Sequence, residues 1–171
     1  MTQANQHYCY KDIIIYSLDV ETYQDSDGNG VGDFRGLLGR LDHLADLGVD
    51  CLWLLPFYPS PNLDNRYDVL DYCEVDPRLG TLEDFDILIR ATRERGMRVL
   101  IDLVSNHTSI EHPWFQEARR NPHSKYRNYY IWEKVKPDPA GLTPAFPGFQ
   151  DTVWTYDEKA GAYYRHQFYH H

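Results

Sequence analysis

Three short apolar runs alternate with two helical patterns in the first part of the chain. The runs cover residues 13–20, 51–55 and 99–104, and they are rich in β-branched and aliphatic side chains. Between them, 34–47 and 81–96 carry apolar residues at the spacing of amphipathic helices. Strands that are nearly continuous in apolar residues and are separated by helices are typical of a parallel sheet buried on both faces. The sequence therefore predicts a βαβαβ unit of an α/β fold.

The two predicted helices have recognisable ends. Gly48 stands where the C-cap of the first helix belongs, and Gly96 ends the second. Thr81 can cap the second helix, and the acids Glu83 and Asp84 in its first turn suit the helix dipole. These ends support the predicted alternation of strands and helices.

Functional residues of a parallel α/β fold collect beyond the carboxyl ends of its strands. In this chain those positions are 25–33, 56–76 and 102–109, which are the most polar stretches of this half of the sequence. The middle stretch is too long for a passive connection inside a compact domain. We therefore expect the functional site on these three segments.

The first of these segments has the spacing of a cation-binding loop. Oxygen-bearing side chains stand at positions 1, 3, 5 and 9 of residues 25–36, and glycine stands at position 6. Ca²⁺ takes roughly six to eight oxygen ligands, and a chain converges them only by coiling tightly. The expected ligands are the side chains of Asp25, Asp27, Asn29 and Asp33 and the carbonyl oxygen of Val31.

Two features separate this loop from an EF-hand calcium sensor. Position 12 is Gly36 instead of a bidentate Glu, and a strand-like run instead of a helix precedes the loop. The alternative is a Gly- and Asp-rich surface turn without an ion, because most segments of such composition are turns. The match at four ligand positions favours metal binding over that alternative.

Composition and charge exclude several classes of protein. The net charge is −9 and the chain has no extended Lys/Arg cluster, which argues against a nucleic-acid partner. There is no apolar run long enough to span a membrane and no apolar core of a signal peptide near the N-terminus. Cys9, Cys51 and Cys73 form no C-x-x-C motif, which fits a reducing compartment, so we expect a cytoplasmic protein.

The pattern changes after residue 109. Residues 112–121 predict a short helix, while 153–156 and 163–168 alternate like two short strands around a turn. This segment is expected to be a small irregular excursion from the third strand. We expect these histidines to lie at the surface: His112, His123 and His166.

Three segments together resemble the α-amylase superfamily, glycoside hydrolase family 13. They are the loop 25–36, the Asn-Arg-Tyr-Asp-Val sequence at 65–69, and the Asp-Leu-Val-Ser-Asn-His sequence at 102–107. Residues 55–61 and 168–171 are most similar to the trehalose synthase branch of that family, to which α-glucosidases and oligo-1,6-glucosidases are near relatives.

The resemblance implies a (β/α)₈ TIM barrel. Residues 1–107 would form its N-terminal part (domain A), with about three strands and two helices. Residues 108–171 would form a truncated, irregular insertion after the third strand, like the domain B of the family. The loop 25–33 would then hold a structural Ca²⁺, with Mg²⁺ as the alternative ion.

The resemblance also implies roles for individual residues. Tyr67 matches the tyrosine that stacks on the sugar ring, and Asp68 matches the acid that hydrogen-bonds its far hydroxyls. His107 is expected to donate a hydrogen bond to the primary hydroxyl of the sugar. Asp102 would hold the strand end in place, and Asn106 would support the insertion or a second ion site. Taken singly, each residue could equally be an ordinary loop or strand-end residue.

One position departs from the pattern of the family. Most relatives have glycine before the stacking tyrosine, and this chain has Arg66. An arginine there is expected to narrow the rim of the pocket.

Retaining glycoside chemistry needs two carboxyl groups roughly 5 Å apart, a nucleophile and an acid/base. In this family the nucleophilic Asp follows the fourth barrel strand and the acid/base Glu follows the fifth, so both are expected beyond residue 171 and no catalytic residue is expected in this chain. A barrel takes roughly 250 residues. We therefore expect an N-terminal part that is inactive alone and self-associates through its exposed half-barrel.

The implied substrates are α-glucosides such as maltose or trehalose. The implied reaction is the intramolecular transglucosylation of maltose to trehalose. An α-glucosidase or amylase, in which water is the acceptor, is the first alternative. A non-catalytic calcium- or sugar-binding domain is the second.

Overall fold

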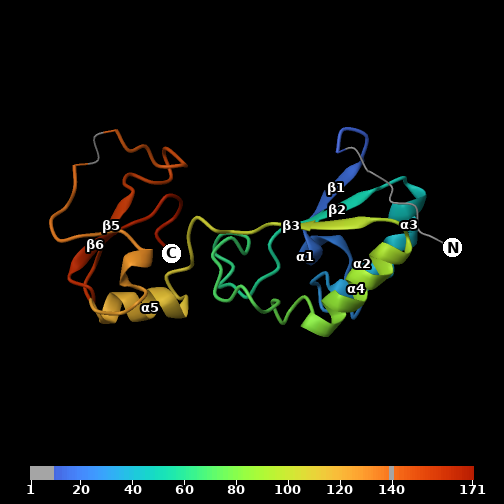
Figure 1. Cartoon of the computed structure of the whole chain (residues 1–171), viewed down its shortest axis with the longest axis horizontal. Helices are drawn as coiled ribbons and strands as arrows, with labels where there is room; N and C mark the ends of the chain where they lie inside the picture. The colour runs from blue at the N-terminus through green and yellow to red at the C-terminus, as the bar shows by residue number, and fades with distance from the viewer. Residues whose placement is uncertain (1–9, 139–140) are drawn as a thin grey trace. The chain divides into compact units, whose positions relative to one another are not determined.

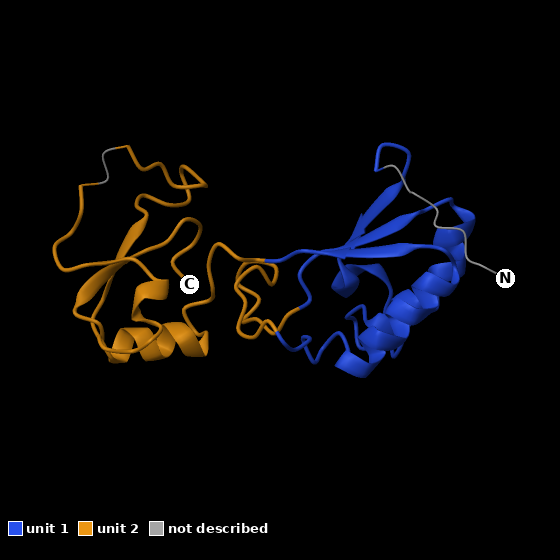
Figure 2. Cartoon of the chain, viewed as in Figure 1, with its two compact units in different colours: residues 1–57, 73–103 blue, residues 58–72, 104–171 orange. Residues whose placement is uncertain are grey.

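The chain forms two compact units, coloured separately in Figure 2. The computed structural model describes residues 10–138 and 141–171. Unit 1 contains the described residues of Met1–Phe57 together with Cys73–Leu103. Unit 2 contains Tyr58–Tyr72 and the described residues of Val104–His171.

Unit 1 is built on a three-stranded parallel sheet in the order β1-β2-β3 (Figure 1). Its strands are β1 (Ile15–Leu18), β2 (Cys51–Leu54) and β3 (Arg98–Ile101). Ser17 lies opposite Trp53, which lies opposite Leu100, so these three side chains share one face of the sheet. The predicted parallel βαβαβ order is confirmed.

The helix predicted over 34–47 is wrong in one respect, because it is interrupted. The structure has α2 (Phe34–Leu38) and α3 (Leu41–Asp46), preceded by a short helix, α1 (Val20–Tyr23). The break falls at Gly39, a weak helix former, and Arg40, whose backbone leaves the helical region with φ −109° and ψ 1°. Leu37, Leu41 and Leu44 of the predicted apolar stripe are buried on both sides of the break, whereas Leu47 is 58% exposed.

The second predicted helix is confirmed as α4 (Leu82–Glu94). The Thr81 hydroxyl accepts a hydrogen bond from the Asp84 backbone N–H at 3.1 Å. In return, the Asp84 carboxylate accepts one from the Thr81 backbone N–H at 3.0 Å. This capping box starts the helix, and Gly96 follows its end with φ 76°.

Within the described residues of unit 1, helices cover one face of the sheet. Figure 1 shows α2, α3 and α4 gathered on one side of the three strands. On the other face, Trp53 is 36% exposed and Leu100 is 48% exposed. The prediction that the strands are buried on both faces is therefore wrong for this chain, because right-handed crossovers place both connecting helices on the same face. The core between helices and sheet includes Leu18, Phe34, Leu37, Leu41, Leu44, Leu52, Leu54, Phe57, Leu79 and Leu88.

Unit 2 contains an antiparallel sheet in the order β4-β6-β5 with one helix, α5 (Pro113–Arg120). Its strands are β4 (Trp132–Glu133), β5 (Trp154–Asp157) and β6 (Ala162–Arg165), and a 3₁₀ helix, η1, covers Arg127–Tyr129. The predicted helix and pair of strands are confirmed, with shorter bounds. Phe115 of α5 packs on the sheet, with ring centroids 5.4 Å from Trp132 and 5.1 Å from Tyr164.

The expected surface histidines are not all at the surface. His123 is exposed, but His112 is buried and His166 is half-buried. Nδ1 of His112 accepts a hydrogen bond from the Trp114 backbone N–H at 3.0 Å, so the ring caps the start of α5. Burial lowers the pKa of both buried rings.

Residues 58–72 belong with unit 2, whereas the sequence placed them in the barrel part. The Leu70 backbone N–H donates to the Pro59 carbonyl at 2.8 Å, which closes this loop on itself. The Ser109 backbone N–H donates to the Val69 carbonyl at 3.0 Å, and Val69 packs with Val104 in a small apolar cluster. These contacts tie the loop to the segment that follows β3. No helix within the described residues has the length and apolar character needed to cross a bilayer.

Candidate functional site

The loop after α1 brings three carboxylates together. Asp25, Asp27 and Asp33 each present one oxygen, and these oxygens lie within 4.8 Å of one another. Oxygens on opposite sides of a bound Ca²⁺ are separated by about 5 Å, given usual Ca–O distances. The three predicted acidic ligands are therefore close enough together to share one such ion.

Asp25 organises the loop through backbone hydrogen bonds. Its Oδ1 accepts from the backbone N–H groups of Asp27 at 3.0 Å and Gly28 at 2.7 Å, and its Oδ2 accepts from Gly30 N–H at 2.8 Å. Gly30 sits at φ 90°, which an L side chain rarely adopts. The bonds from Gly30 and Gly28 lower the pKa of Asp25, so the carboxylate is ionised at neutral pH.

Asp33 links the same loop to α2. As the N-cap of that helix it accepts from Gly36 N–H at 2.7 Å, and its other oxygen accepts from the Ser26 backbone N–H and hydroxyl, both at 2.9 Å. Burial acts to raise the pKa of Asp33, but the hydrogen bonds from Ser26 and Gly36 outweigh it and the pKa is lowered. A second ionised carboxylate is thus held beside Asp25.

The remaining predicted ligands take part in the turn itself. The side-chain oxygen of Asn29 accepts from Val31 N–H at 2.7 Å, and the Asp27 carboxylate accepts from Asn29 N–H at 3.0 Å. These bonds coil the chain tightly, as the predicted ligand spacing requires.

Two glycines let the loop approach α1 closely. A Cβ on Gly32 would lie 2.1 Å from the Val20 carbonyl oxygen, and a Cβ on Gly36 would lie 2.0 Å from that of Gln24. In the structure the Gly32 N–H donates to the Glu21 carbonyl at 2.6 Å. The position of the carboxylates thus depends on main-chain packing that only glycine permits.

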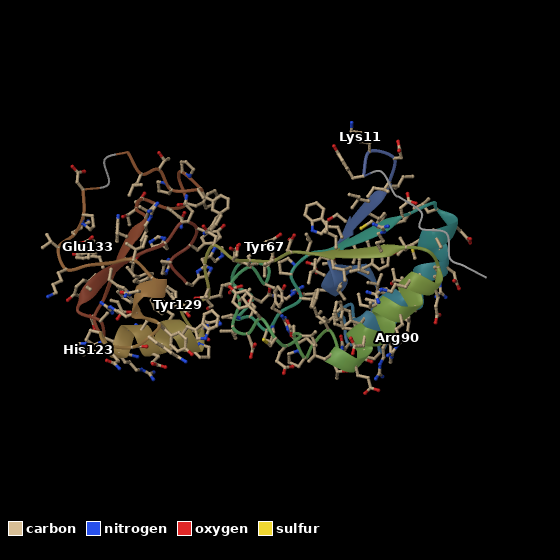
Figure 3. All side chains as sticks on the ribbon, viewed as in Figure 1. Lys11, Tyr67, Arg90, His123, Tyr129 and Glu133 are labelled. Carbon is tan, nitrogen blue, oxygen red and sulfur yellow. The ribbon has the colours of Figure 1, made fainter. Side chains whose placement is uncertain are left out.

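The loop 58–72 carries Tyr67, which Figure 3 labels, in an unusual backbone. Three residues that are not glycine have positive φ: Asn62 at 58°, Asn65 at 46° and Arg66 at 66°. Each such residue costs about 1–3 kcal/mol and persists only where the surroundings hold it. The Tyr67 N–H donates to the Asp64 carbonyl at 2.9 Å, which closes the turn over Asn65 and Arg66.

Asp68 is almost completely buried, at 2% exposed. One carboxylate oxygen accepts from the Ser60 hydroxyl, and the other accepts from the Leu63 backbone N–H at 2.9 Å. Asp68 therefore braces its own loop. Its predicted contact with a sugar stays a prediction.

Asp64 is a site residue that the sequence reasoning missed. It is half-buried, and burial together with the negative charge of Asp68 raises its pKa, while His107 and His171 act in the opposite direction. Asp64 is thus a partly accessible carboxylate in the electrostatic field of His107. The local sequence does not distinguish Asp64 from the other polar residues of its loop, and only the folded structure shows which of them lies near His107.

His107 lies with this loop in unit 2. Burial lowers its pKa, against the opposing effects of Asp64, of a hydrogen bond to the Tyr67 backbone and of Asp68. Nδ1 of His107 lies 3.2 Å from Nδ2 of Asn106, an amide donor, which assigns the ring proton of neutral His107 to Nε2. The structure therefore brings the predicted residues Tyr67, Asp68 and His107 together.

Two aromatic residues support His107. The Tyr72 hydroxyl lies 2.7 Å from the Val104 carbonyl and 2.8 Å from the His107 carbonyl. Burial raises the pKa of Tyr72 to about 12, so its hydroxyl keeps the proton that one of these bonds uses. The ring of Phe168 lies 5.1 Å from that of His107, which adds a residue near the C-terminal end of the chain to the site.

Asp102 belongs to unit 1 and stands directly after β3. Its carboxylate accepts a hydrogen bond from Nε1 of Trp53 at 2.8 Å, which ties the end of β3 to β2. This geometry is compatible with the predicted role of holding the strand end.

Residues 17–171 match the family model described as the α-amylase catalytic domain. The chain belongs to the α-amylase family. It is 48% identical over 162 residues to the trehalose synthase of Thermus thermophilus, covering 95% of this chain and 16% of that protein. It is 45% identical over 161 residues to the oligo-1,6-glucosidase of Bacillus cereus, covering 93% of this chain and 28% of that protein.

Solved structures of the same family agree with this assignment. The trehalulose synthase MutB from Pseudomonas mesoacidophila MX-45 superposes with a TM-score of 0.86 at 41% identity, covering 94% of this chain and 29% of that one. The chain thus spans less than a third of the length of these relatives.

Membership of the α-amylase family explains the exposed face of the sheet in unit 1. The three strands are the N-terminal part of a TIM barrel, as predicted. In such a barrel one face of the sheet meets the helices and the other lines the interior. Trp53 and Leu100 lie on the face away from the helices, which is the barrel-lining face.

Proposed function

We propose that this chain is the N-terminal part of a retaining enzyme that acts on α-glucosides and converts maltose to trehalose by intramolecular transglucosylation. The observation that carries the proposal is the convergence of Tyr67, Asp64 and His107 in one unit. The similarity to proteins named trehalose synthase supports the choice of reaction.

Each of these side chains has a task that its chemistry suits. The Tyr67 ring offers an apolar face for a sugar ring, and its hydroxyl gives a polar edge. Asp64 accepts hydrogen bonds from sugar hydroxyls, and His107 donates one to the primary hydroxyl in exchange for its hydrogen bond to the Tyr67 backbone. The chain thus binds and orients the glucosyl group, while the nucleophile and the acid/base are proposed to lie outside it.

A hydrolase is the second candidate, favoured by the similarity to oligo-1,6-glucosidases. The glucosyl group would be held in the same way, with water as the acceptor. A non-catalytic calcium- or sugar-binding domain is the third, since the cation loop and the sugar site need no further residues to bind.

A chimera tests the enzyme proposal. This chain replaces the matching 162 residues of the Thermus thermophilus trehalose synthase, and trehalose formation from maltose is followed by chromatography. We expect an active chimera that loses more than about 100-fold in kcat/KM on Tyr67→Ala or His107→Ala, because a misplaced sugar reacts slowly.

The controls separate the candidates. Tyr129→Ala, at an exposed tyrosine elsewhere in unit 2, is expected to leave the chimera unchanged. In a second chimera the oligo-1,6-glucosidase of Bacillus cereus is the host, and a rise in trehalose relative to glucose is expected. Glucose alone would favour the hydrolase, and an inactive first chimera would contradict an enzymatic role.

We also propose that the loop 25–33 binds a structural Ca²⁺, with Mg²⁺ as the alternative ion. The ligands would be Asp25, Asp27, Asn29 and Asp33 with the Val31 carbonyl. Mg²⁺ demands six oxygens at about 2.0–2.1 Å, whereas Ca²⁺ tolerates longer and less regular contacts. The approach of the three carboxylates supports a shared cation, and an irregular set of side-chain and carbonyl oxygens suits Ca²⁺ better.

Calorimetric titration of the chain with Ca²⁺ tests this proposal. We expect saturable binding of about one ion per chain. The double substitution Asp25→Asn and Asp33→Asn removes two of the negative charges, so binding should weaken by more than about 100-fold. Asp46→Asn, at an exposed acid of α3, is the matched control and should bind normally. Equal affinity in the double variant would contradict the assignment.

A further inference from the structure

Arg66 combines two features that rarely occur together. Its side chain is 1% exposed, and its backbone lies in the left-handed region at φ 66°, directly after Asn65 at φ 46°. Glycine adopts this conformation without strain. The backbone therefore does not require an arginine, and the buried guanidinium must contribute something that offsets the strain.

The position of Arg66 controls the main chain of Tyr67. The turn over Asn65 and Arg66 is closed by the bond from Tyr67 N–H to the Asp64 carbonyl at 2.9 Å. The Tyr67 backbone in turn hydrogen-bonds His107. A rotation at Arg66 would displace Asp64 relative to the Tyr67 ring and would weaken the contact with His107.

We propose that Arg66 is a positioning residue, whose buried side chain anchors the left-handed turn 64–67 so that Tyr67 and Asp64 stay directed at the sugar held by His107. The orientation of Tyr67 and Asp64 toward a sugar rests on the proposed function. The anchoring of the turn 64–67 beside His107 is independent of that function.

The first experiment uses the chain alone and no substrate. The ring proton signals of His107 are followed by NMR against pH, and His107→Gln assigns them among the eight histidines. In Arg66→Gly the pKa of His107 is expected to shift, because the turn that carries the hydrogen bond between the Tyr67 backbone and His107 loses its buried side chain. Asn65→Gly is the matched control, since it relieves strain in the same turn and keeps the guanidinium, so its titration should equal that of the unsubstituted chain.

Arg66→Lys keeps a buried cation, so the pKa of His107 in this variant should lie between the values of Arg66→Gly and the unsubstituted chain. An unchanged His107 titration in Arg66→Gly, with only a lower melting temperature, would overturn the proposal and leave Arg66 as a contributor to stability alone.

The second experiment uses the trehalose synthase chimera. Arg66→Gly is expected to raise KM for maltose by about 10-fold, with a smaller change in kcat, while Asn65→Gly leaves both unchanged. Equal KM values for maltose in Arg66→Gly and in the unsubstituted chimera would overturn the positioning role. An inactive unsubstituted chimera would contradict the proposed function instead, and the NMR titration would still decide whether Arg66 positions the turn.

Discussion

Gly36→Ala is expected to destabilise unit 1 by roughly 3 kcal/mol and to abolish calcium binding. The added Cβ would lie 2.0 Å from the Gln24 carbonyl oxygen, 2.8 Å from the Gln24 carbonyl carbon and 3.0 Å from its Cγ. Two of these are backbone atoms, so α2 must move away from α1. That movement displaces Asp33, the N-cap of α2, from Asp25. Urea unfolding followed by circular dichroism and calcium titration measure the two effects.

Gly39→Ala is the matched control. Its Cβ would have the Gly36 carbonyl oxygen at 3.4 Å as its nearest neighbour, an ordinary contact, and its backbone lies in the right-handed helical region at φ −66°. We expect a change within about 0.5 kcal/mol and normal calcium binding. Equal destabilisation by the two alanines would show that the close approach to α1 is not the cause.

Arg119→Met is expected to destabilise unit 2 by about 3 kcal/mol. Arg119 of α5 forms an ion pair with Asp157 of β5, where the side chains are 18% and 4% exposed. The other oxygen of Asp157 accepts from Ala160 N–H at 2.8 Å. Methionine keeps most of the apolar stem beside Phe115 but leaves a buried carboxylate without its cation. Trp114, Trp132 and Trp154 all lie in unit 2, so tryptophan fluorescence in a urea titration reports mainly on this unit.

The double variant Arg119→Met with Asp157→Asn tests the cause. The asparagine carbonyl can still accept from Ala160 N–H, and no buried charge is left unpaired. The double variant should therefore be more stable than Arg119→Met alone. A double variant that is no more stable would show that lost packing dominates.

The approach of three acidic side chains in the loop 25–33 was predictable because their spacing is local. Asp25, Asp27 and Asp33 lie within nine consecutive residues, and their mutual approach follows from tight turns that Asp and Gly favour. The helix α4 was predictable for the same reason, since Thr81 and Asp84 form its cap within one turn. The break between α2 and α3 was missed, because the apolar period continues across Gly39.

The group of residues around His107 was only partly predictable. Tyr67 and His107 were found through their resemblance to a family, and the structure places them in the same unit. Asp64 was missed because its relation to His107 spans 43 positions of the sequence, from 64 to 107, and depends on how two segments pack. The burial of Arg66 was missed for a similar reason, since a charged side chain is usually exposed.

The alternation of strands and helices, the parallel sheet and the family were predictable from the sequence, because they depend on periodicity and on short motifs. Only the tertiary structure decided that residues 58–72 pack with the segment after β3, that Asp68 braces its loop, and that Asp64 lies in the field of His107. Those features depend on how the loop 58–72 folds on itself and packs against the segment after β3, and the apolar periodicity of strands and helices does not extend into this loop.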